Sequence, residues 1–355
     1  MKILQVIPSL GSGGAERFVC ELSEHLNKKR DVQCYVATLY SREYNSFYNL
    51  DNKIYIGDFK KKPGFDFRCL FRVYKHIRAN NYSVVHVHIN AILYIVLSAF
   101  LLPQVRFIAT IHSDAYFEAP GKLDRIIRKI LFKSKKVQAV TISEESHISF
   151  EKLYHIPAPV IYNGMSDYNP QTSSDVGYCF DDNIVFIHPA SCQPVKNQQL
   201  LFSAFQKLAL KYKNVKLLWF GSNTTYQDLF LELSKYFSDQ IVYCGCVDNM
   251  RDYMAKADAV CLSSIKEGMP MSIIEAFSVG CIPIVTPAGG CVNMVSNGVD
   301  GFVSASFGVE DYYNILESFV LLSPEKLNQM KTASRASFYK YTIDVCADNY
   351  LELYA

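Results

Sequence analysis

Apolar and polar positions follow a repeating order along the chain: a short apolar run, a turn, and a segment with helical spacing. The first example is KILQVIP (2–8), a glycine-rich turn, and then AERFVCELSEHLNKK (15–29), in which Phe18, Val19 and Leu22 recur at helical intervals. DVQCYVATL (31–39) has the composition of a strand. Strands that alternate with helices predict a parallel sheet covered on both faces.

The same order continues in two series. In the first, the further apolar runs are YSVVHVHI (82–89), RFIATIH (106–112) and VQAVTIS (137–143). PVIYNGMSDYNPQTSSDVGY (159–178) is rich in Asn, Ser, Pro, Gly and Asp, which is typical of a linker. The second series has its apolar runs at NIVFIHPAS (183–191), VKLLWFGS (215–222), IVYCGCV (241–247), DAVCLSS (258–264) and CIPIVT (281–286).

A chain of 355 residues is long enough for two domains of this kind. We expect an α/β protein with two doubly wound, Rossmann-like domains, at residues 1–165 and 180–337. A last helix is expected over about 327–355, with its part from about 338 packing on the first domain. Facing sheets would bring their carboxyl ends to one cleft, where such folds bind ligands. The apolar run 91–102 is too short to span a bilayer and is predicted to be a buried helix.

Composition fits a globular protein, with 50% hydrophobic and 20% charged residues. The net charge of +2 conceals an asymmetry: residues 1–165 carry 23 Lys and Arg against 14 Asp and Glu, and residues 166–355 carry 13 against 20. The first half is therefore expected to meet an anionic partner. Eleven scattered cysteines favour buried thiols in a reducing cytoplasm, and the N-terminal residues do not have the organisation of a signal peptide. Cys244 and Cys246 lack a second pair, so no metal site is predicted.

Candidate chemistry is densest in EGMPMSIIEAFSVG (267–280). Glu267 is predicted on a loop, Pro270 in the first turn of a helix, Glu275 inside that helix and Gly280 at its end. The helix N-terminus presents backbone N–H groups that suit phosphate oxygens, and carboxylates accept hydrogen bonds from sugar hydroxyls. Together they indicate a nucleotide sugar. The alternative is a surface glutamate and a buried glutamate that satisfies a loop.

This stretch, continued by CIPIVTPAGG, resembles the signature of the retaining glycosyltransferases of family 4, which have the GT-B fold. The resemblance extends over nearly the whole chain, through SLGSGGAERF (9–18), VVHVH (84–88), ATIHS (109–113), VIYNGMS (160–166) and VKNQQLLFSAF (195–205). As a set, these motifs are highly specific to the family.

The resemblance implies roles for individual residues. Glu275 would hold the ribose hydroxyls, Glu267 the hydroxyls of the donor sugar, Lys196 the diphosphate, and His112 the sugar or the transferring centre. The remaining positions implied on the donor side are Gly13, Gly14, Ser191, Asn197, Gly221, Val247, Gly268, Met269, Pro270 and Met271. His88 and Ser113 would lie on the acceptor side. The implied reaction is a front-face substitution with retention, which uses a nucleoside-diphosphate sugar as co-substrate and no cofactor or metal.

One position departs from the family pattern. In PASCQPVK (189–196), Ser191 stands where the family usually has an arginine, which removes one cation from the diphosphate site. A catalytically weak partner subunit is therefore an alternative, and a nucleotide-sugar epimerase of the same fold is a second one that Glu267, Glu275 and Lys196 argue against. GSGGAE (11–16) lacks the third glycine of a dinucleotide motif and does not favour a dehydrogenase.

The acceptor side has a basic segment, KLDRIIRKILFKSKK (122–136), with seven basic residues and one acidic residue. We expect a helix with one basic and one apolar face; the basic face comprises Arg125, Arg128, Lys129, Lys133 and Lys136, and the apolar face Ile126, Ile127, Ile130 and Leu131. Such a helix would dock on an anionic membrane where a lipid-linked or glycan acceptor is presented. The alternative is a solvated helix whose apolar face belongs to the core. Aromatic residues do not interleave with the basic residues of this segment, so nucleic acid is not predicted as a partner.

Family analogy suggests that the protein is a cytoplasmic or peripheral membrane enzyme of surface polysaccharide assembly, capsular or lipopolysaccharide.

Overall fold

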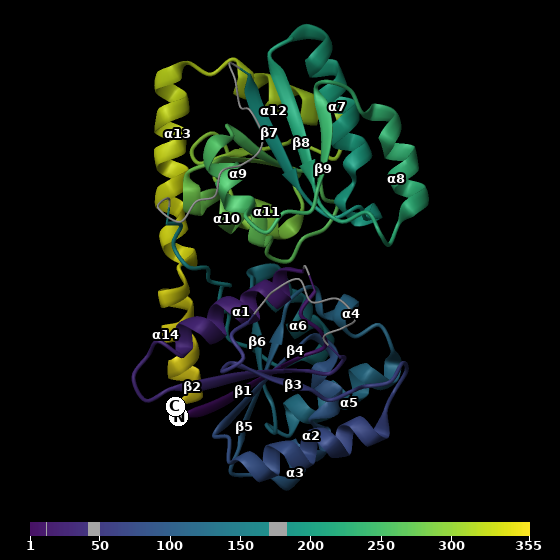
Figure 1. Cartoon of the computed structure of the whole chain (residues 1–355), viewed down its shortest axis with the longest axis vertical. Helices are drawn as coiled ribbons and strands as arrows, with labels where there is room; N and C mark the ends of the chain where they lie inside the picture. The colour runs from purple at the N-terminus through teal and green to yellow at the C-terminus, as the bar shows by residue number, and fades with distance from the viewer. Residues whose placement is uncertain (12, 42–49, 170–182) are drawn as a thin grey trace. The chain divides into compact units, whose positions relative to one another are not determined.

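The computed structural model describes residues 1–11, 13–41, 50–169 and 183–355. They form two compact units: Met1–Ser166 together with Tyr341–Ala355, and Asp167–Lys340. Each unit is a parallel sheet with helices on both faces (Figure 1). The predicted α/β class with two doubly wound sheets is therefore confirmed.

The first unit has six parallel strands in the order β3-β2-β1-β4-β5-β6, so the order reverses between β1 and β4. The strands are β1 Lys2–Ile7, β2 Gln33–Thr38, β3 Tyr55–Asp58, β4 Val84–His88, β5 Arg106–Ile111 and β6 Gln138–Thr141. Ligands of doubly wound sheets bind beyond the carboxyl ends of the strands at such a reversal.

Two buried cores cover this sheet. One face packs against α1 (Gly14–Leu26) and α14 (Ile343–Tyr354), through Phe18, Leu22 and Tyr350 among others. The helices on the other face are α2 Phe67–Asn80, η2 Ile89–Tyr94, α3 Val96–Leu101, α5 Lys122–Lys133 and α6 Glu144–Tyr154, with the short α4 (Ala115–Glu118) before α5. The apolar run 91–102 is buried for the most part, but it divides between η2 and α3, so the single helix expected there was wrong.

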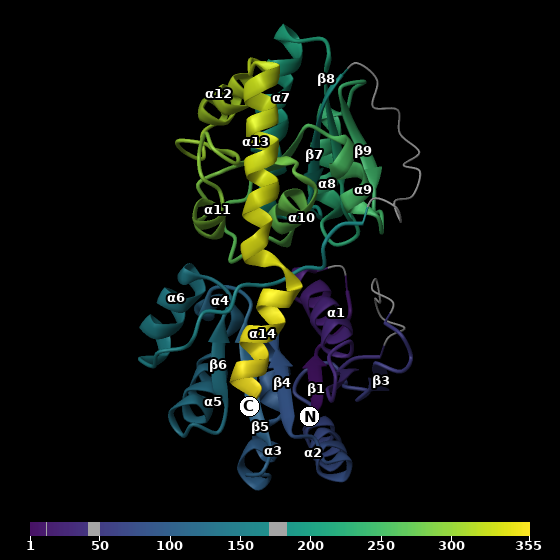
Figure 2. The same cartoon turned by 90° about the vertical axis from the view of Figure 1, so that its left-hand side faces the viewer.

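The end of the chain also differs from the expected single helix. α13 (Pro324–Ser337) belongs to the second unit, a 3₁₀ turn follows at Phe338–Tyr341, and α14 returns to the first unit, where it packs beside α1 (Figure 2). Tyr341 O accepts from Met165 N (2.9 Å), and Met165 O accepts from Ile343 N (2.8 Å). These two bonds fix the start of α14 to the end of the first unit's main segment.

The second unit repeats the strand order of the first: β12-β11-β10-β7-β8-β9, with the reversal between β7 and β10. The strands are β7 Ile184–Pro189, β8 Val215–Phe220, β9 Ile241–Gly245, β10 Ala259–Leu262, β11 Ile282–Val285 and β12 Phe302–Val303. α7 (Gln198–Lys211), α8 (Gln227–Leu233) and α12 (Val309–Val320) pack on one face, and α9 (Met250–Lys256) and α10 (Met271–Val279) on the other.

Among the described residues, no helix has both the length and the hydrophobicity needed to cross a bilayer.

Candidate active site

Two charged side chains meet at the strand-order reversal of the second unit. Lys196 lies in the 3₁₀ turn η4 (Pro194–Lys196) after β7, and Glu267 lies on the loop after β10; Lys196 Nζ is 2.6 Å from Glu267 Oε1. Ser264 Oγ donates to the same carboxylate oxygen at 2.6 Å. The loops are also joined by a bond from Ser263 Oγ to Lys196 O (2.8 Å), so the ion pair sits on two connected loops.

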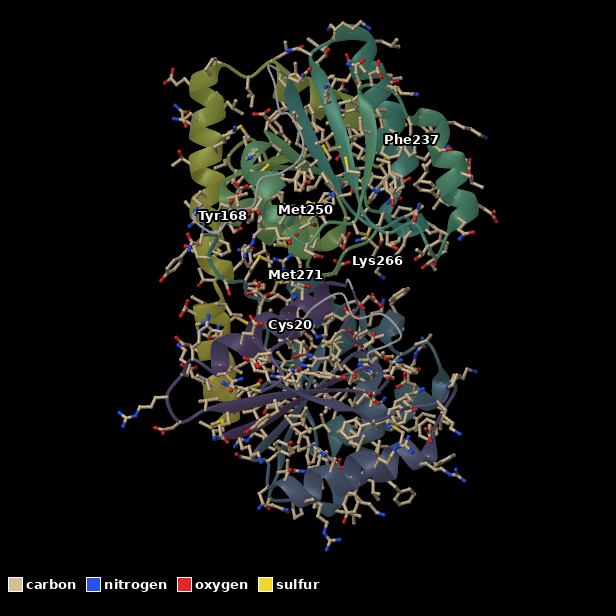
Figure 3. The ribbon with its side chains drawn as sticks, viewed as in Figure 1. Cys20, Tyr168, Phe237, Met250, Lys266 and Met271 are labelled. Carbon is tan, nitrogen blue, oxygen red and sulfur yellow. The ribbon has the colours of Figure 1, made fainter. Side chains whose placement is uncertain are left out.

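The helix that follows this loop begins at Met271, with Pro270 as its N-cap residue rather than in its first turn as expected. Proline has no side-chain acceptor for the first-turn N–H groups. The N–H of Ile273 donates to Pro270 O at 3.0 Å instead. Met271 and Lys266, at the two ends of the loop segment, are labelled in Figure 3. Glu275 is only 6% exposed within α10. Gly280, in the left-handed region at φ +71°, ends the helix as predicted.

The sequence analysis missed Gly290, which lies in the first turn of α11 (Gly289–Met294). Its N–H donates to Glu267 O at 3.0 Å, and a Cβ atom built on it would lie 2.1 Å from Gly268 O. The close approach of α11 to the Glu267–Gly268 backbone thus requires glycine at this position. The signal for it was present in the PAGG sequence that ends the family motif.

The remaining predicted donor-side residues follow the carboxyl ends of neighbouring strands. Ser191 is half-buried after β7, where its hydroxyl accepts from Gln193 Nε2 (2.9 Å) and its carbonyl from Gln198 Nε2 (2.9 Å). Asn197 adopts the left-handed conformation between η4 and α7. Gly221 follows β8, and Val247 comes two residues after β9. All four therefore lie at the edge of the sheet that carries Lys196 and Glu267.

In the first unit, the predicted residues also gather at one edge. Gly13 is the N-cap residue of α1 and Gly14 its first residue, following β1, although residue 12 between this turn and the strand lies outside the described residues. His88 ends β4, and His112 and Ser113 follow β5. His88 Nδ1 is 2.9 Å from His112 Nε2. Because His88 is fully buried, its side chain meets His112 rather than solvent.

Glu118, at the end of α4, is a second residue that sequence reasoning missed. Its Oε1 accepts from the backbone N–H groups of His112 (2.5 Å) and Ser113 (3.1 Å), so it holds the loop after β5. Burial raises the pKa of Glu118 to about 7, against the opposing effects of Arg128 and of these N–H groups. The only sequence signal was an acidic residue six positions after His112, which is weak.

Arg128 corrects the predicted basic face of α5. Its side chain is 1% exposed, and Arg128 Nε lies 2.6 Å from Asp124 Oδ1 while Nη1 lies 3.7 Å from Glu118 Oε2. A buried guanidinium needs paired carboxylates, and these two provide them. Arg128 therefore supports the His112 loop from inside the unit and is not available to an anionic surface.

The apolar face of α5 is also divided. Leu131 is buried in the core, whereas Ile126 (54% exposed) and Ile130 (52%) face outward, together with Leu123 (70%) one turn earlier. Phe117 of the preceding α4 is 77% exposed. An exposed apolar stripe with Lys122, Lys129 and Lys133 on the same helix is thus the observed surface of α5.

The model of the glycosyltransferase family 4 matches residues 12–167, and that of the glycosyl transferases group 1 matches residues 175–337. The chain belongs to this glycosyltransferase family. The two matches together cover most of both compact units, and both models describe glycosyltransferases.

Several curated relatives match most of the chain. N-acetyl-alpha-D-glucosaminyl L-malate synthase of Bacillus anthracis is 24% identical over 78% of this chain and 75% of its own length. The capsular polysaccharide biosynthesis glycosyltransferase CapH of Staphylococcus aureus is 23% identical over 80% of this chain and 81% of its own.

Solved structures establish the fold as GT-B. HepE of Anabaena, in complex with UDP, superimposes with a TM-score of 0.80 over 99% of both chains at 18% identity. Sucrose-phosphate synthase of Thermosynechococcus elongatus gives 0.80 over 100% of this chain and 98% of its own at 13% identity. The predicted GT-B family and fold are therefore confirmed.

Proposed function

We propose that the protein transfers a hexose-type sugar, with retention and without a metal, from a UDP-sugar to a glycan or lipid-linked acceptor during the assembly of a surface polysaccharide such as a capsule or lipopolysaccharide. The observation that carries this proposal is the Lys196–Glu267 pair at the strand-order reversal, directly before the N-terminus of α10.

Lys196 and Glu267 satisfy each other as an ion pair. A diphosphate that arrives at the end of α10 would take over the Lys196 ammonium, and Glu267 would then be free to accept hydrogen bonds from the sugar hydroxyls. As the glycosidic bond breaks, negative charge develops on the leaving phosphate, and a fixed cation near a helix N-terminus stabilises it most at that point. Glu275, buried in the same helix, is proposed to hold the ribose hydroxyls.

Front-face attack is proposed for the transfer step. Once Lys196 has moved to the diphosphate, the Glu267 carboxylate still accepts a hydrogen bond from Ser264 Oγ and would accept others from the sugar hydroxyls. These bonds lower the nucleophilicity of the carboxylate and disfavour a covalent glycosyl intermediate on it. In the front-face route, an oxygen of the leaving diphosphate accepts the proton of the acceptor hydroxyl while that hydroxyl bonds to the anomeric carbon.

The similar proteins support the donor and acceptor classes. HepE of Anabaena has been solved with UDP and with UDP-glucose. CapH is named for capsular polysaccharide biosynthesis, and a Campylobacter jejuni relative, 22% identical over 78% of this chain and 76% of its own, is named as an N-acetylgalactosaminyltransferase acting on an undecaprenol-diphosphate glycan.

A thermal-shift screen against UDP-, GDP-, ADP- and dTDP-sugars tests the donor. A ligand that binds only the folded state at a hundred times its dissociation constant adds about 2.7 kcal/mol to the free energy of unfolding. We expect a shift with UDP-sugars that Glu275→Ala abolishes and that Glu310→Ala, a substitution of a surface carboxylate in the same unit, preserves. The absence of a shift with every donor would favour the alternative of a weak partner subunit and would make Ser191 its cause.

Metal independence is tested by adding EDTA to the transfer assay. Because Lys196 and the helix N-terminus supply the positive charge, we expect the initial rate to remain unchanged. A loss of activity that Mg²⁺ or Mn²⁺ restores would contradict this part of the proposal.

We also propose that α5 docks the enzyme on the inner face of the cytoplasmic membrane. Leu123, Ile126 and Ile130 would enter the interface between headgroups and acyl chains, while the lysines of the helix meet anionic headgroups. Each lysine near an anionic surface adds about 1 kcal/mol to binding at physiological ionic strength. The burial of Arg128 leaves fewer cations than the sequence indicated, so the apolar stripe is expected to contribute most of the affinity.

Sedimentation with vesicles of phosphatidylglycerol and phosphatidylcholine tests this docking. We expect binding to anionic vesicles that Leu123→Gln with Ile126→Gln and Ile130→Gln abolishes. The matched control replaces exposed apolar residues of the second unit by glutamine: Leu210, Leu231 and Leu321. Equal loss in both triple variants, or no binding by the original protein, would reject the membrane role.

A further inference from the structure

Three histidines form a buried hydrogen-bonded cluster inside the first unit. His86 and His88 lie on β4, and both are fully buried, as is Gln5 on β1. His86 Nδ1 lies 2.7 Å from Tyr354 Oη, and His86 Nε2 lies 2.7 Å from Thr110 Oγ1. His88 Nε2 lies 2.8 Å from Gln5 Oε1, and His88 Nδ1 lies 2.9 Å from His112 Nε2.

The chemistry of Gln5 sets the direction of the hydrogen bonds that join Gln5, His88 and His112. An amide oxygen only accepts hydrogen bonds, so His88 Nε2 must carry the proton that it donates to Gln5 Oε1. The neutral His88 ring then has a bare Nδ1, which accepts from His112 Nε2–H. The neutral His112 ring is left with a bare Nδ1. The amide nitrogen of Gln5 is directed to Tyr354 Oη at 3.5 Å, in agreement with this orientation of the amide.

The three rings remain neutral near pH 7 because burial disfavours the imidazolium form. It lowers the pKa of His86 and His88 far below the usual range and the pKa of His112 to about 3. The direction of each hydrogen bond is therefore decided by the tautomer of each ring and not by its protonation.

The cluster is satisfied at every ring nitrogen except one. Both nitrogens of His86 and both of His88 have partners, whereas His112 Nδ1 is buried and has no hydrogen-bond partner among the residues that the structure describes. A purely structural network would fill this acceptor, because an unsatisfied buried acceptor destabilises a folded protein. Phe18 packs edge-on against both His88 and His112 and fixes the rings in place.

We propose that Gln5 and His88 are positioning residues that hold His112 in the Nε2–H tautomer, so that its Nδ1 is kept as an acceptor for a hydroxyl group of a ligand. The inference rests on the proposed function only for the nature of that ligand, a sugar. The opposite tautomer would present an N–H group there, which could not accept a hydroxyl proton.

The test is the ¹⁵N spectrum of histidine-labelled protein at pH 7, in which long-range couplings to ring protons distinguish the two tautomers. The eight histidines are assigned by single substitutions. We expect His88 and His112 both to show a protonated Nε2 and a bare Nδ1. A protonated Nδ1 or a cationic ring at His112 would overturn the proposal.

Gln5→Met is the decisive variant. Methionine offers no amide oxygen to His88 Nε2–H, so His88 and His112 should each populate both tautomers. Gln5→Glu is the conservative variant: its carboxylate accepts from His88 Nε2–H as the amide oxygen does, so the tautomer of His112 should be retained. An unchanged His112 spectrum in folded Gln5→Met would overturn the proposal, and if Gln5→Met does not fold, the spectrum of the original protein decides.

Activity gives a second readout. Gln5→Met should lower kcat/KM for transfer by about tenfold, as expected for one lost hydrogen bond, and Gln5→Glu should retain most of the activity. The UDP-induced thermal shift should not change, because Lys196 and Glu275, which are proposed to hold the diphosphate and the ribose, lie in the other unit. Gln33→Met, an exposed substitution on β2, is the matched control. If the original protein transfers no sugar, the proposed function is rejected. The spectra would still decide whether Gln5 and His88 set the tautomer of His112.

Discussion

Lys196 is the residue whose charge the proposed chemistry uses most directly. Lys196→Met removes the cation that stabilises the leaving diphosphate and should lower kcat by about a hundredfold to a thousandfold, the usual effect of removing one electrostatic contact to a transition state. The measurement is steady-state transfer from a UDP-sugar, with Lys213→Met as the exposed control in the same unit. A kcat within a few-fold of the original would remove Lys196 from the catalytic machinery.

Gly290 is required for steric reasons, because a larger side chain would clash with the neighbouring backbone. The Cβ atom introduced by Gly290→Ala would lie 2.1 Å from Gly268 O, so the Glu267–Met271 loop or α11 must shift. We expect the free energy of unfolding to fall by about 2 kcal/mol, within the range for overpacked sites, together with weaker UDP binding. Urea denaturation and the thermal shift measure these two effects.

Gly121→Ala is the control for the change in backbone entropy, since its added Cβ would meet no heavy atom closer than 3.9 Å. Equal stability losses in both variants would show that steric exclusion at Gly268 is not the cause.

At the scale of the elements, α4 and α5 support the His112 loop through Glu118 and Arg128. The pKa of Glu118 is raised from 4.5 to about 7, so the folded state retains this proton over a pH range in which the unfolded state has lost it. The free energy of unfolding therefore falls as pH rises between about 4.5 and 7.

Glu118→Gln keeps an acceptor for the two backbone N–H groups and cannot ionise. Relative to the original protein, this variant should gain roughly 2–3 kcal/mol in free energy of unfolding between pH 5 and pH 8, from the size of the pKa shift. Urea denaturation at both pH values measures the gain, and Glu151→Gln, an exposed carboxylate on α6, should show none. A pH-independent difference for Glu118→Gln would contradict the raised pKa of this buried carboxyl group.

At the scale of the whole molecule, the two units differ in their chain connectivity. The second unit is one continuous segment, Asp167–Lys340, whereas the first needs both Met1–Ser166 and α14. Without α14, the sheet face beside α1 would lose Ile343, Tyr350 and Tyr354 from its core. We expect a 167–340 fragment to unfold cooperatively and to bind UDP, and a 1–166 fragment to lack a cooperative transition.

Adding a peptide of residues 341–355 to the 1–166 fragment should restore a cooperative transition, as followed by circular dichroism. Cooperative unfolding of the 1–166 fragment by itself would show that α14 is dispensable for the first unit.

Local patterns in the sequence determined the α/β class, the two series of strands and helices, and the end of α10 at Gly280, because each depends on spacing or on a conformational preference of one residue. The family motifs also placed the loops that carry Lys196, Glu267 and His112.

Only the tertiary structure showed that Lys196 and Glu267 are paired, that Gly290 contacts the Gly268 backbone and that Arg128 is buried while Ile126 and Ile130 are exposed. These features depend on which strands are neighbours and on which helix surfaces the sheet covers. Helical spacing fixes the faces of α5 relative to one another, but the packing of the unit decides which face turns inward. The contacts of Gln5 with His88 and Tyr354 join segments distant in sequence, so no local pattern could reveal them.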